Sequence, residues 1–107
     1  MDTNPLSARE KLVKVLCAMR KYLALEGNDF SWSSWDNQEL ALAEMDSFID
    51  ALQNGHKVDV SVLAMLFAPT GPIQETSLSS GWGQNFVEMA SEFDSTLAEY
   101  TNTDFNN

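Results

Sequence analysis

Few residues of this 107-residue chain are of types suited to catalysis, and none has a suitable partner at a recognised spacing. The single histidine, His56, lies in a Gly-His-Lys turn, where no motif places a nucleophile beside it. Ser79 and Ser80 precede Gly81, but the G-x-S-x-G order of a nucleophile elbow is missing. We therefore expect no catalytic residue and no enzymatic activity.

Metal and cofactor sites have equally little support in the sequence. Cys17 is the only cysteine, and a single thiol forms neither a zinc cluster nor an internal disulfide. Carboxylates at helical spacing, such as Glu88 and Glu92, would need Glu-x-x-His partners to form a di-metal centre. The segment 81–83, Gly-Trp-Gly, lacks the third glycine of a dinucleotide-binding loop. We expect no metal and no cofactor.

The acidic side chains are the most distinctive chemical feature of the chain. Sixteen Asp and Glu residues oppose six Lys and Arg residues, which gives a net charge of −10. Five of the six bases lie within the first 21 residues, and from residue 22 onward Lys57 is the only base among fourteen acids. Such a surface repels phosphates, so we expect no binding to nucleic acid or to membranes. Either the charge serves solubility alone, or it attracts a basic protein partner.

One set of acids falls on a single face of a predicted helix over residues 36–54. At 100° per residue, Asp36, Glu39, Asp46 and Asp50 lie within about 80° of one another. Charged outer faces usually mix both signs, yet no Lys or Arg occurs between residues 22 and 56. Solvation alone would explain a charged face, but the uniform sign favours an interaction surface.

Three aromatic residues precede this helix within six positions, namely Phe30, Trp32 and Trp35. One interpretation is that they close one end of a helical bundle, with Trp35 packing just before the helix. The other is that Trp32 or Trp35 anchors a partner, because tryptophan is enriched among the residues that dominate binding energy. A second candidate binding face combines Glu75 and Trp82 with Glu88 and Glu92.

Hydrophobic periodicity predicts the elements that position these residues. A stripe at steps of three and four predicts a helix over 80–100 and consists of Trp82, Phe86, Met89, Phe93, Leu97 and Tyr100. A first helix over 5–26 has Pro5 in its first turn, the capping pair Ser7 and Glu10, and Gly27 at its end. Asp36 is the predicted cap of the helix over 36–54.

The remaining segments complete a predicted four-helix domain. A short helix over 60–68 is apolar nearly all round, which is typical of a centrally buried helix. Residues 69–83 contain two prolines and three glycines and predict a long loop before the last helix. The tail 101–107 is polar and expected to fray. We expect one all-α domain over 1–107.

Location and assembly follow from the same composition. No apolar run approaches the roughly 18 residues of a membrane span, and the first residues lack the order of a secretion signal. The lone thiol suits a reducing compartment, so we expect a cytoplasmic protein. We expect a monomer or a weak dimer.

Residues 67–86 read Phe-Ala-Pro-Thr-Gly-Pro-Ile-Gln-Glu-Thr-Ser-Leu-Ser-Ser-Gly-Trp-Gly-Gln-Asn-Phe and continue through Glu88, Ala90 and Phe93 to Asp94. This run resembles the C-terminal signature of a family of small, acidic, uncharacterised bacterial proteins, a domain of unknown function. The pieces that carry the resemblance are Ala-Pro-Thr-Gly-Pro and Ser-Ser-Gly-Trp-Gly, and the N-terminal half matches only in pattern. The resemblance implies an immunity protein of the kind encoded beside polymorphic or contact-dependent toxins.

An immunity protein must find its toxin rapidly, and an acidic surface would be steered toward a basic toxin. Two other functions fit the same charge. One is a DNA-mimicking inhibitor of a defence nuclease, of the anti-restriction or anti-CRISPR type, which requires carboxylates spaced like phosphates over the whole surface. The other is an acidic secretion chaperone or adaptor, which would commonly dimerise through an exposed apolar face.

Overall fold

The computed structural model describes residues 6–69 and 71–104, which form five helices and no strand. The helices are α1 (Ala8–Leu23), α2 (Gln38–Gln53), α3 (Val60–Phe67), α4 (Pro72–Ser80) and α5 (Gly83–Asp104). The predicted all-α class is confirmed. The predicted number of four helices is wrong, because α4 lies within the segment predicted as a loop.

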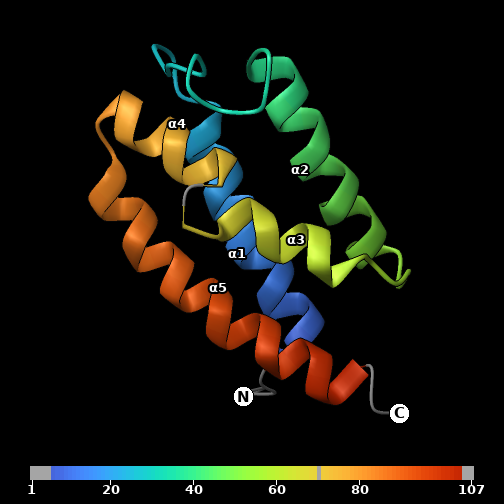
Figure 1. Ribbon diagram of the computed structural model, residues 1–107. Helices are drawn as coiled ribbons and strands as arrows, with labels where there is room; N and C mark the ends of the chain where they lie inside the picture. The colour runs from blue at the N-terminus through green and yellow to red at the C-terminus, as the bar shows by residue number, and fades with distance from the viewer. Residues whose placement is uncertain (1–5, 70, 105–107) are drawn as a thin grey trace, which may run out of the picture.

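The first helix is the centre of the arrangement. Both α5 and α2 pack against α1, while α4 packs on α5 and α3 packs on α4. Figure 1 shows α3 and α4 following one another between α5 and α2. The stacked rings of Phe67 and Phe93, whose centroids are 3.9 Å apart, join the end of α3 to α5.

The start of α1 has the predicted capping box. The Ser7 hydroxyl accepts a hydrogen bond from the Glu10 amide at 3.1 Å, and the Glu10 carboxylate accepts one from the Ser7 amide at 2.9 Å. These bonds satisfy amides that have no partner within the helix. The helix ends at Leu23 rather than at residue 26. Pro5, predicted in its first turn, lies outside the described residues.

The second helix begins at Gln38, two residues later than predicted, and its cap is Asn37 rather than Asp36. Asn37 is extended, and its side-chain oxygen accepts a hydrogen bond from the Leu40 amide at 2.9 Å. Asparagine and aspartate cap helices about equally well, so the residue type of Asp36 did not exclude its neighbour Asn37 as the cap. Asp36 lies before the helix and is exposed.

The fourth helix fits between two glycines. Pro72 occupies its first turn, where the missing amide hydrogen costs nothing, and Gly81 ends it in the left-handed region at φ 88°. Thr76 and Ser77 are fully buried, and their hydroxyls donate to the helix's own carbonyls, those of Pro72 and Gln74. The residue types that suggested a loop therefore belong to a helix. Proline starts it, glycine ends it, and buried hydroxyl residues line its inner face.

The last helix carries most of the predicted apolar stripe. Phe86, Phe93 and Tyr100 are buried, whereas Met89 and Leu97 are partly buried against the core. Trp82 is also buried but precedes the helix, which begins at Gly83 because Ser79 and Ser80 belong to α4. The helix continues past residue 100 to Asp104, so the first part of the predicted tail is helical. Residues 105–107 lie outside the described part of the chain.

Candidate functional site

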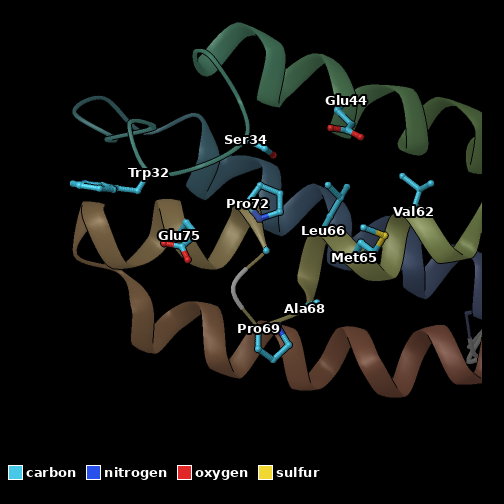
Figure 2. A pocket seen from close by; sticks show the side chains of 11 residues that line it. Trp32, Ser34, Glu44, Val62, Met65, Leu66, Ala68, Pro69, Pro72 and Glu75 are labelled. Atoms are coloured by element: carbon cyan, nitrogen blue, oxygen red, sulfur yellow. The ribbon is translucent and has the colours of Figure 1, made fainter.

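A groove of about 610 Å³ opens between α2 on one side and α3 with α4 on the other. Figure 2 shows Glu44 pointing from α2 across this space toward Val62, Leu66 and Met65 of α3. The turn between α3 and α4 contributes Ala68, Pro69 and Gly71 to the lining, so it includes part of the Ala-Pro-Thr-Gly-Pro segment.

Three apolar side chains that line the groove are exposed to solvent. Trp32 is 74% exposed, Met65 is 68% exposed and Val62 is 39% exposed. A large indole left in water is unusual for a core-building residue, since tryptophan is highly buried on average. Figure 2 shows Val62 and Met65 near one another on α3, with Trp32 at the other end of the groove. Large exposed apolar patches on a protein surface mark interaction sites.

The connection between α1 and α2 presents Trp32. On either side of it, Phe30 and Trp35 pack inward with ring centroids 6.5 Å apart, and the Trp35 indole donates to Glu44 at 2.8 Å. The Ser31 amide donates to Asp29 at 2.9 Å and tightens the turn. Phe30 and Trp35 thus close the bundle end as one interpretation predicted, while Trp32 remains outside.

The charged side chains that line the groove in the described residues are both acidic. Glu44 and Glu75 are half-buried, and Figure 2 shows Glu75 on α4 near Trp32. Carboxylates beside an apolar surface favour a ligand that combines apolar side chains with positive charge.

The exposure of α3 corrects one expectation. A helix without a polar face was expected to be centrally buried, and Leu63, Leu66 and Phe67 are indeed buried. Val62 and Met65 face the groove instead, because α2 packs on α1 and leaves this side of α3 uncovered.

Two of the three predicted tryptophan anchors lie in the core. Trp35 and Trp82 are 7% and 6% exposed. The Trp82 indole donates to the Asn28 side-chain oxygen at 2.9 Å, and the Asn28 amide donates to the carbonyls of Tyr22 and Leu23 at the end of α1. Trp82 therefore fastens the Ser-Ser-Gly-Trp-Gly segment to α1, and neither indole presents a surface to a partner in this conformation.

The predicted acidic face of α2 is divided by an ion pair. The Arg20 guanidinium donates two hydrogen bonds to Asp46, at 2.6 and 3.1 Å, and the hydrogen bond raises the pKa of Arg20. Asp46 therefore joins α2 to α1, whereas Asp36, Glu39 and Asp50 are exposed. Three of the four predicted carboxylates are exposed outside this ion pair, and the Asp46 side chain itself is half-exposed.

The second predicted face does not form a single surface. Glu75 lines the groove and Trp82 lies in the core, whereas Glu88 and Glu92 are exposed on α5. Glu92 borders a different hollow together with Lys11 and Lys14 of α1. Neither Glu88 nor Glu92 lines the groove. Of the predicted binding residues, Trp32 and Glu75 are the two that the structure brings together in the groove.

No three Asp, Glu, His or Cys side chains of residues 6–69 and 71–104 come together as a group that could hold a metal ion. Within the same ranges, no helix has both the length and the apolar character needed to cross a bilayer.

Comparison of the chain with family models, with curated proteins and with solved structures produced no match. The function is therefore inferred from the residues themselves. Sequence reasoning missed Met65, Val62 and Glu44 as groove residues. The available signal was the nearly all-round apolar character of α3, since such a helix is either buried or covered by a partner.

Proposed function

We propose that this chain is a cytosolic immunity protein that binds and neutralises a cognate, basic bacterial toxin through its acidic surface. The observation that carries the proposal is the distribution of charge over the helices. Helices α2 to α5 contain no Lys or Arg, and three of them, α2, α4 and α5, carry carboxylates without any base of their own. A basic protein is the partner that this field attracts.

The bases of α1 leave this acidic character largely intact. Arg20 pairs with Asp46, and Lys11 pairs with Glu99 at 3.1 Å. These ion pairs neutralise the charge of one acid on α2 and of one acid on α5. Asp36, Glu39 and Asp50 remain exposed toward solvent on and beside α2. Exposed charges of one sign accelerate association with an oppositely charged protein, and salt weakens that effect.

The exposed apolar groove favours a protein partner over the DNA-mimic alternative. A phosphate mimic needs regularly spaced carboxylates and has no use for Trp32 and Met65 in water. A secretion chaperone or adaptor would use an apolar face too, but it would commonly dimerise through that face. A chain that is monomeric by analytical ultracentrifugation would argue against that alternative.

Co-expression tests the proposal. The chain is produced in a susceptible bacterial host together with the product of the gene that neighbours its own, and host survival is measured. We expect survival to depend on the chain, and the double variant Glu39→Lys with Asp50→Lys to protect less well. Both positions are exposed, so the folded state should tolerate the changes.

The matched control is Glu88→Lys with Glu92→Lys on α5, which alters net charge by the same amount at exposed positions. Equal loss of protection in both double variants would indicate that total charge, rather than the α2 face, attracts the toxin. If the neighbouring product is not toxic, or if the chain gives no protection against it, the immunity proposal fails.

A further inference from the structure

We propose that the groove between α2 and α3–α4 binds a basic amphipathic helix of the partner, with the apolar side chains of that helix seated against Trp32, Val62 and Met65. The inference rests on the proposed function in taking the partner to be a basic protein. The inference goes beyond the proposed function because it assigns the contact with the partner to one groove. It also specifies that the bound segment of the partner is a basic amphipathic helix.

The apolar part of the inference comes from exposure and shape. The two most exposed apolar residues of the groove, Trp32 and Met65, project from the connection between α1 and α2 and from α3, with Val62 beside Met65 on α3. The groove volume of about 610 Å³ lies within the usual range of ligand sites. Methionine adapts to differently shaped partners, and tryptophan provides a large contact area.

The helical form of the occupant follows from the backbone. The described residues contain no strand, so the groove offers no sheet edge to which an extended peptide could add. Apolar side chains of α3 also supply no hydrogen bonds to a peptide backbone. A helix satisfies its own amides and carbonyls and presents side chains at i, i+3, i+4 and i+7, as in known helix-in-groove complexes.

The basic character of the occupant follows from charge complementarity. Glu44 and Glu75 are the charged side chains of the described lining, and the helices on both sides of the groove, α2, α3 and α4, contain no Lys or Arg. A helix with Lys or Arg beside its apolar stripe would place those charges next to the two carboxylates. An acidic or neutral helix would gain nothing from them.

A second copy of this chain fits the groove less well. Each copy has a net charge of −10, so two copies repel one another. Among the described helices, only α1 contains Lys or Arg. Its apolar residues Leu12, Leu16 and Met19 are already fully buried in the core. No described helix of this chain therefore presents a basic amphipathic face to another copy.

The test uses the full chain and a synthetic 14-residue peptide of leucine and lysine, with the leucines at i, i+3, i+4 and i+7. Binding is measured by isothermal titration calorimetry and by the NMR signals of the indole N–H groups. We expect the Trp32 signal to shift during titration. The Trp82 signal should stay in place, because that indole is buried and bonded to Asn28. A peptide with glutamate in place of lysine should not bind.

Matched variants separate the groove from the general field of the protein. Met65→Ser should weaken binding about tenfold, as for a residue at the centre of an interface, while Val87→Ser on α5 should change it less than about twofold. Both residues are exposed and apolar, so neither change should unfold the chain. Glu75→Lys should weaken binding more than Glu88→Lys, although both alter the net charge equally.

Three results of these measurements on the purified chain would overturn the inference. The first is peptide binding that Met65→Ser and Val87→Ser affect equally. The second is stronger binding by the glutamate peptide. The third is a stable dimer that Met65→Ser dissociates, since the groove would then be a contact between copies. The proposed function is tested separately. If toxin neutralisation is lost in the α2 charge variant but kept in Met65→Ser, the immunity function is supported and the groove is rejected as the contact.

Discussion

At the scale of single residues, the three tryptophans differ in burial and in what their indoles contact. Trp82 donates to Asn28 and lies 5.1 Å from Tyr22 between ring centroids, whereas Trp35 donates to Glu44. Trp32 is 74% exposed and projects beside the groove. Two indoles thus stabilise the folded chain, and the third is available for contact.

Replacing the buried indole should therefore cost stability. Trp82→Phe removes the donor to Asn28 and leaves the side-chain oxygen of that residue without its partner. We expect the free energy of unfolding to fall by about 2 kcal/mol, measured by urea denaturation.

Trp32→Phe is the matched control, because it makes the same chemical change at an exposed position. Its effect should lie within about 0.5 kcal/mol. Equal losses in the two variants would contradict the distinction between a core indole and a contact indole.

The turn that presents Trp32 contains a carboxyl whose ionisation is coupled to folding. Hydrogen bonds from the Ser31 hydroxyl and the Ser31 amide lower the pKa of Asp29. A carboxyl with a lowered pKa stabilises the folded state at pH above its unfolded value, and that contribution is lost as the pH falls through the folded value.

Asp29→Asn should accordingly flatten the dependence of stability on pH below about pH 4, the region of the unfolded aspartate pKa. Asparagine keeps a side-chain oxygen that can accept from Ser31, so the comparison isolates the charge. Urea midpoints at several acidic pH values measure the effect. Identical pH profiles for the variant and the original chain would show that the carboxylate contributes nothing.

At the scale of the elements, the sequence correctly predicted α1, α2, α3 and α5 as helices. It missed α4, which lies in a segment that was predicted as a loop. The stripes of α1, α2 and α5 are long and regular, and the Ser7–Glu10 capping box marks one boundary directly. Helix α4 has only nine residues and a weak apolar periodicity. Its buried hydroxyls bond to its own carbonyls, and this bonding depends on three-dimensional burial that composition does not reveal.

The turn between α3 and α4 gives a direct test of this fold. Gly71 approaches the preceding backbone so closely that an added Cβ would lie 2.5 Å from the Met65 carbonyl oxygen and 2.9 Å from that of Ala68. Backbone atoms cannot move aside without opening the turn. Gly71→Ala should therefore destabilise the chain by more than about 1 kcal/mol in urea denaturation.

Gly83→Ala provides the control in the first turn of α5. The nearest atom to its added Cβ would be a side-chain carbon of Leu78 at 3.0 Å, and Leu78 is exposed and free to shift. Alanine also favours helix over glycine by up to about 1 kcal/mol. We expect this variant to be neutral or more stable. A neutral Gly71→Ala would contradict the close turn.

The candidate site was predictable only in part. The sequence marked Trp32 because an aromatic connection precedes the second helix, and it marked Glu75 as part of a candidate face with Trp82. It could not show that Met65 joins them, since that depends on α2 packing against α1 and away from α3. The pairing of Asp46 with Arg20 was equally hidden, because it crosses from one helix to another.

At the scale of the whole molecule, one helix with both kinds of charge is surrounded by helices without bases. Basic residues of α1 pair with acids of α2 and α5, as in the pairs Arg20–Asp46 and Lys11–Glu99. The exposed carboxylates of α2 and α5 create a negative field, and the half-buried Glu44 and Glu75 line the exposed apolar groove. This combination can both attract a basic protein and hold it by apolar contact.

The most direct test of this account is the affinity of the purified chain for the purified product of the neighbouring gene, measured by isothermal titration calorimetry at increasing salt. Electrostatic attraction weakens as salt shortens the screening length from about 10 Å at 0.1 M to about 3 Å at 1 M. We predict tight binding at low salt that weakens steadily with added salt, and weakens further in Glu39→Lys with Asp50→Lys. No binding, or an affinity that does not change with salt, would contradict the proposal that the acidic surface recognises a basic protein.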